Sequence, residues 1–168
     1  STPALWLSQS AAMSPAERRR LERNAAAERV RLADVPGRTE KERLRLAQNA
    51  LDRYHALLSR WQNEPQAAED VILARIDRLG ALYAKGDYRQ VISEYESLTA
   101  AQHPVPDWVI GWVISAYLQE KNAVAAFSLV QRYPHYASDP QDEEHALFYA
   151  WLDTGQYQTA RRYVERET

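Results

Sequence analysis

The chain has 168 residues, of which 45% are apolar and 26% charged, with a formal net charge of −2, ten tyrosines, five glycines and no cysteine. This length and composition suit one folded domain or one compact stack of repeats, and they argue against a β-rich or disulfide-stapled fold. The lack of cysteine excludes thiol catalysis and cysteine–zinc sites, and no run approaches the roughly 18 apolar residues of a membrane span.

The two ends of the chain indicate a piece of a longer protein. The opening STPALWL has neither an initiator Met nor the basic start and long apolar core of a signal peptide. The closing YVERET falls inside a helical pattern. We therefore expect an excised segment, with the targeting signal encoded upstream of it.

The small net charge conceals an asymmetry along the chain. Residues 1–62 carry 12 Lys or Arg against 7 Asp or Glu, whereas residues 63–168 carry 9 against 16. An acidic half of that size repels nucleic acid, so none is expected as a partner, and favours a cationic partner. A solvated surface that is merely acidic explains the same numbers, and both interpretations stay open.

The first predicted helix covers residues 14–35. Ser14 is its N-cap, Pro15 takes the first helical position, and the segment is rich in the strong helix formers Ala, Arg and Glu. Residues 17–23, ERRRLER, interleave glutamates with arginines at i, i+4 spacing. That spacing favours a solvated helix face over a nucleic-acid site.

A second long helix is predicted after the Pro-Gly-Arg break. Thr39 and Glu42 form a capping box, and the apolar period continues to about Trp61. Pro65 separates this helix from another that covers about residues 66–84. We expect residues 1–63 to form capping helices at the N-terminal end of a repeat stack.

Residues 64–168 carry a repeated pattern. The phrase LYAKGDYRQVISEY (82–95) recurs as WLDTGQYQTARRYV (151–164), and turn residues fall at Gly86, Lys121-Asn122 and Gly155, spaced 35 and then 34 residues apart. Such a period indicates stacked helical hairpins, because one hairpin alone cannot bury its apolar face. The apolar stripes of the first two leading helices consist of Ile76, Leu79, Gly80 and Tyr83, and then Ile110, Val113, Ile114 and Tyr117.

This pattern resembles the tetratricopeptide repeat, although the second turn lacks its glycine. The predicted fold is all-α: a right-handed superhelical stack of tetratricopeptide-like helical hairpins, three of them degenerate repeats within residues 64–168.

The leading helix of each hairpin is expected to line a concave groove with the stripe opposite its buried one. Small residues alternate there with aromatics and carboxylates, which suits a sugar chain: ring faces take C–H groups, and carboxylates take hydroxyl or ammonium groups. The alternative is that Trp108 and Tyr149 pack against a neighbouring loop or repeat. The predicted polymer-binding groove consists of Asp77, Trp108, Trp112, Ser115, Asp142, His145, Tyr149 and Asp153.

Catalytic chemistry finds little support in the sequence. The four histidines lack metal-ligand spacing, and no paired carboxylates converge as a glycan-cleaving enzyme needs. The acids of QDEEH (141–145) stand at a predicted helix start, where they complement the helix dipole. We therefore predict a protein that is not an enzyme and has no catalytic, cofactor or metal site.

Part of the chain resembles one family more closely. The segments RTEKERLRLAQNALDRYHALL, DRLGALYAKGDYRQVISEY and WVISAYL are similar, in order and spacing, to the periplasmic repeat region of outer-membrane exporters of poly-β-1,6-N-acetylglucosamine (PNAG). The resemblance covers about residues 14–131 and continues more weakly through DEEHALFYAWLDTGQY.

The resemblance implies a periplasmic domain of an outer-membrane protein, with a C-terminal outer-membrane barrel in the same full-length chain. It implies a non-catalytic scaffold whose partners are partly deacetylated PNAG, the periplasmic PNAG deacetylase, or both. The alternative interpretation is a generic protein–protein adaptor of another cell-envelope assembly.

Overall fold

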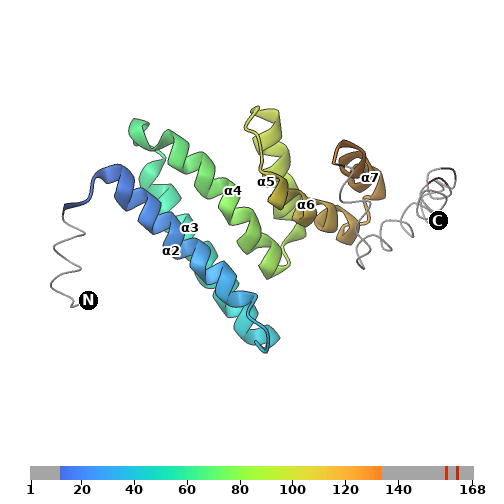
Figure 1. Cartoon of the computed structure of the whole chain (residues 1–168), viewed down its shortest axis with the longest axis horizontal. Helices are drawn as coiled ribbons and strands as arrows, with labels where there is room; N and C mark the ends of the chain where they lie inside the picture. Colours follow the sequence, from blue (N-terminus) through green and yellow to red (C-terminus); the bar gives the residue numbers. More distant parts are fainter. Residues whose placement is uncertain (1–11, 134–157, 159–161, 163–168) are drawn as a thin grey trace. The chain divides into compact units, whose positions relative to one another are not determined.

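The structure is a computed structural model that describes residues 12–133 together with residues 158 and 162 (Figure 1). Its described elements are all helical, and no strand occurs among them, so the prediction of an all-α fold is confirmed. The chain divides into two compact units, residues 1–86 and 87–168. The elements are α2 (Pro15–Ala33), α3 (Glu40–Trp61), the short 3-10 helix η1 (Pro65–Ala67), α4 (Ala68–Lys85), α5 (Tyr88–Ala100), α6 (Asp107–Gln119) and α7 (Ala123–Arg132).

Helices α2 and α3 begin where the sequence predicts that they do. The Ser14 hydroxyl accepts a hydrogen bond from the Glu17 backbone N–H at 3.2 Å, and the Thr39 hydroxyl accepts one from the Glu42 N–H at 3.1 Å. Each bond satisfies one of the N–H groups that the first turn of a helix leaves without an intrahelical partner. Both predicted N-caps are therefore confirmed.

The first two predicted turns are confirmed as well, and they share one backbone geometry. Gly86 ends α4 with φ 82°, and Lys121 follows α6 with φ 62°, both in the left-handed region that favours glycine. Gln102, which follows α5, also has φ 62°. The third predicted turn, at Gly155, lies outside the described residues.

Helices α2, α3 and α4 of the first unit pack against one another (Figure 1). Alanines on all three helices let the backbones approach closely, and larger side chains from α3 fill the remaining space. Because α4 shares this core, the first unit extends to Gly86. The core cluster consists of Ala26, Ala50, Tyr54, Leu57, Trp61, Ala67, Ala74 and Ala81.

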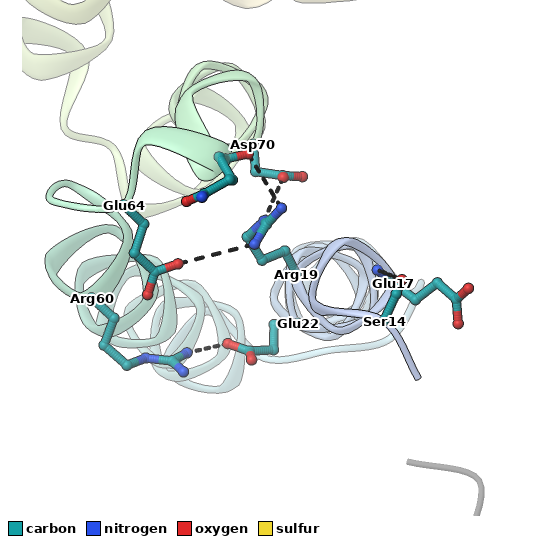
Figure 2. Close-up of polar contacts among 8 residues, drawn as sticks. Ser14, Glu17, Arg19, Glu22, Arg60, Glu64 and Asp70 are labelled. Carbon is teal, nitrogen blue, oxygen red and sulfur yellow. Dashed lines mark hydrogen bonds and ion pairs between the residues drawn. The ribbon is translucent and has the colours of Figure 1, made fainter. Parts of the chain in front are cut away.

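A buried ion pair joins α2 to the start of α4 (Figure 2). Arg19 is 9% exposed, and its Nε donates to Asp70 Oδ2 at 2.7 Å. Its Nη2 donates to the backbone carbonyl oxygen of Gln66 at 3.2 Å. The Nε of Arg23, one turn further along α2, lies 3.8 Å from Asp70 Oδ1. One carboxylate therefore faces two guanidinium groups.

The prediction that residues 17–23 form a solvated helix face is wrong for Arg19 and Arg23. Glu22 stands at i+3 from Arg19, but α4 lies against α2 and supplies a carboxylate of its own to both arginines. Glu22 of the same segment forms a more exposed ion pair with Arg60 of α3, so this pair lies between α2 and α3 (Figure 2).

In the second unit, α6 packs against both α5 and α7. The apolar stripe predicted for this helix is buried throughout, which confirms it: Ile110, Val113, Ile114 and Tyr117 are at most 6% exposed. The Tyr117 hydroxyl lies 2.7 Å from Glu96 Oε1 of α5 and donates a hydrogen bond to it. This unit therefore has a central helix covered on two sides.

Candidate functional site

The structure describes half of the predicted groove. Trp108, Trp112 and Ser115 lie on α6 and Asp77 lies on α4, in the other compact unit. The remaining four predicted residues lie outside the described part of the chain: Asp142, His145, Tyr149 and Asp153.

The two tryptophans form an aromatic pair at the start of α6. They stand at i and i+4 on the helix, and their ring centroids are 5.5 Å apart with an interplanar angle of 84°, an edge-to-face arrangement. Trp108 is 54% exposed although tryptophan is among the most apolar large side chains. An exposed indole supported by a second indole is a suitable platform for the C–H face of a sugar ring.

Ser115 does not join this exposed surface. It is 8% exposed, within a run of buried residues that extends from Val113 to Tyr117. A helix that packs against neighbours on two sides buries more than one stripe, so the face opposite the apolar one is not open here. Ser115 therefore belongs to the packed part of α6.

Asp77 faces the interior of the first unit. Burial raises the pKa of its carboxyl group, and the positive charge of Arg23 on α2 opposes that rise. Burial also raises the pKa of Tyr54 on α3, and the charge of Asp77 adds to this increase. The electrostatic neighbours of Asp77 are thus side chains of α2 and α3.

We expect Asp77→Asn to stabilise the chain at neutral pH. Folding raises the pKa of the Asp77 carboxyl group above its usual value of 3.8. As the pH rises through these two pKa values, the carboxyl group ionises more readily in the unfolded state than in the folded state, so the folded state loses stability. The Asp77→Asn variant has no carboxyl group at this position and does not lose this stability. Its melting temperature should exceed that of the parent at pH 7, and the two should converge near pH 3. A lower melting temperature of the variant at pH 7 would mean that the attraction to Arg23 outweighs the cost of burial.

One pocket in the second unit was not predicted. Its volume is 360 Å³, and it lies where the end of α5, the following loop and the end of α7 meet. His103, one of the four histidines that lack metal-ligand spacing, lines this pocket together with Tyr95, Gln102 and Arg132. No local motif marks these residues, because α6 separates Arg132 from the others along the chain.

The described residues contain neither a group of three side chains able to hold a metal ion nor a helix long and apolar enough to cross a membrane. The tryptophan pair on α6 and the tyrosines of the pocket offer ring faces and hydrogen-bonding groups. Their arrangement is suited to binding.

Comparison with known proteins identifies relatives of the chain. No protein-family model matches it. It is 37% identical over 136 residues to the poly-β-1,6-N-acetyl-D-glucosamine export protein of Escherichia coli strain K12, and equally to that of Escherichia coli O157:H7. The match covers 78% of this chain and 17% of each relative, so the chain spans about a sixth of their length. The resemblance predicted from the sequence is thereby confirmed: over most of its length, this chain is a relative of the poly-β-1,6-N-acetyl-D-glucosamine export proteins.

Proposed function

We propose that this chain is a non-catalytic periplasmic scaffold domain of polysaccharide export. It binds partly deacetylated PNAG, the PNAG deacetylase, or both, and guides the polymer toward the outer membrane. The observation that carries the proposal is the 37% identity to PNAG export proteins over 78% of the chain. The exposed Trp108–Trp112 pair supports the choice of a saccharide as the ligand.

The charge distribution supports a weak, movable attachment of the polymer. Partial deacetylation leaves free amines that are cationic at neutral pH, and residues 63–168 carry 16 acids against 9 bases. Attraction between such charges acts at many points and is screened by salt. A polymer that is being exported needs weak binding of this kind, because a tightly bound polymer would not dissociate from the domain.

The first unit offers a different surface. Exposed basic side chains lie along α2 and α3, and a protein partner with an acidic face would complement them. We assign docking of the deacetylase, rather than of the cationic polymer, to this surface because like charges repel. The exposed cations on these two helices are Arg18, Arg20, Arg31, Lys41, Arg43, Arg45, Arg53 and Arg60.

The proposal predicts that Trp108→Ala weakens binding of partly deacetylated β-1,6-linked glucosamine oligomers. We expect a loss of about fivefold to tenfold in affinity, the equivalent of roughly 1 kcal/mol for one ring contact. Calorimetric titration at low and physiological salt measures both the loss and the electrostatic contribution. Val124→Ala is the control, because Val124 is also exposed, at 60%, and lies on α7 of the same unit.

The titration separates the candidate ligands. Binding that does not change in Trp108→Ala would remove the aromatic pair from the site. Binding that does not weaken with added salt would remove the electrostatic part of the proposal. If no oligomer binds, the domain is a protein-docking platform, and the deacetylase is the next ligand to titrate.

A further inference from the structure

The pocket of the second unit has a buried floor and an accessible rim. Tyr95 is 6% exposed, whereas Thr99, Gln102 and Arg132 around it are exposed. Tyr133, directly after α7, completes the wall, and its backbone N–H donates to the Leu129 carbonyl at 2.8 Å. At 360 Å³ the pocket lies near the small end of the range of about 300–1,000 Å³ for small-molecule sites.

The side chains around the Tyr95 hydroxyl are close enough to change its pKa. Burial is the main cause that raises the pKa of Tyr95, and Tyr133 adds to the increase. Thr99 and Arg132 lower it. Two phenols, a hydroxyl and a guanidinium group therefore converge on one small volume, with ring faces beside hydrogen-bonding groups.

Gln102 contributes to the pocket from a backbone position that favours glycine. Its φ is 62°, and it follows α5 in a helix-ending motif in which the His103 N–H donates to the Leu98 carbonyl at 2.9 Å. Lys121 follows α6 with the same φ of 62°, but it does not line the pocket. The left-handed backbone alone therefore does not mark a site. What distinguishes Gln102 is that it lines the pocket.

The charge of the pocket restricts its ligand. Arg132 is a permanent cation, and none of the residues that line the pocket is a carboxylate. A free ammonium group would be repelled, whereas a carbonyl oxygen would accept hydrogen bonds from the guanidinium or from the Gln102 amide. Tyrosine rings offer faces to the C–H side of a sugar ring.

We infer that this pocket binds one neutral N-acetylated hexosamine unit of a saccharide chain. The inference rests on the proposed function, and it adds a second recognition site beside the Trp108–Trp112 pair. Acidic surfaces attract the deacetylated, cationic units of the polymer, and this pocket takes an acetylated one. With these two kinds of site, the domain would bind both the acetylated and the deacetylated units of a partly deacetylated polymer.

The test is an NMR titration of the ¹⁵N-labelled 168-residue chain with two β-1,6-linked disaccharides, one N-acetylated and one with free amines. We expect the acetylated disaccharide to shift backbone resonances of residues 99–105 and 132–133 and to bind at least fivefold more tightly than the amine. Arg132→Leu should reduce that preference at least threefold, because the repelled amine then enters more easily.

Gln102→Gly and Lys121→Gly form a matched pair. Both replacements place glycine at a left-handed position, so both should raise the melting temperature. Only Gln102→Gly should weaken binding of the acetylated disaccharide, by about threefold or more, because only Gln102 lines the pocket. Equal binding by the two variants, together with an unchanged preference in Arg132→Leu, would overturn the inference.

The remaining outcomes separate this inference from the proposed function. If the saccharides shift only resonances around Trp108, the pocket inference is overturned and the proposed function stands. If acetate alone shifts the pocket resonances as strongly as the acetylated disaccharide, the pocket is an anion site and the inference is overturned. If neither saccharide binds anywhere on the chain, both the pocket inference and polymer binding are overturned.

Discussion

Trp61→Ala should lower the free energy of unfolding of the first unit by about 3–5 kcal/mol, the usual cost of deleting a buried tryptophan ring. Trp61 is 3% exposed at the end of α3 and belongs to the core cluster with Leu57 and Ala67. Its removal leaves a cavity that alanine side chains around it are too small to fill. Amide hydrogen exchange of α3 is the suitable measurement, because it reports this unit separately from the other.

Trp108→Ala is the matched control, since it makes the same chemical change at a ring that is 54% exposed. We expect its effect on the exchange of α6 amides to stay within about 1 kcal/mol. A loss similar to that of Trp61→Ala would mean that Trp108 is part of the core. The aromatic pair would then no longer be a candidate saccharide platform, and the packing alternative would hold.

Local signals in the sequence predict the helices and their ends well. The N-caps at Ser14 and Thr39 and the turns at Gly86 and Lys121 depend on side chains and backbone within four residues of each position. The periodicity of apolar residues likewise predicts the buried stripe of α6, because a stripe is a property of one helix.

Contacts between segments that are far apart in the sequence could not be predicted from such local patterns. The partner of Arg19 is Asp70, which lies 51 residues away, so spacing within α2 could only suggest contacts on the same helix. Ser115 seemed to belong to an open face because periodicity does not say how many neighbours a helix has. The pocket combines α5 with α7, and its residues share no spacing that a motif could detect.

Arg19→Met should destabilise the first unit by about 2–3 kcal/mol. Removal of one member of a buried ion pair leaves the other charge in a poorly hydrated place, which costs about 3–5 kcal/mol at fully buried sites. The side chains of Arg19 and Asp70 are 11% and 17% exposed, so we expect a loss smaller than at a fully buried site. Asp70 keeps a second cation, Arg23, at 3.8 Å, which limits the loss further. Amide hydrogen exchange of α2 and α4 measures the effect.

Arg60→Met provides the comparison at a second ion pair of α2, which joins α2 to α3 (Figure 2). The Arg60 and Glu22 side chains are 58% and 35% exposed, and such a pair contributes about 1 kcal/mol or less. A double variant, Arg19→Met with Asp70→Leu, should lose less than the sum of its single variants, because each single variant already breaks the same ion pair and leaves one of its two charges without that partner. Equal losses in Arg19→Met and Arg60→Met would contradict this account. Burial would then give the Arg19 pair no special role in holding α2 against α4.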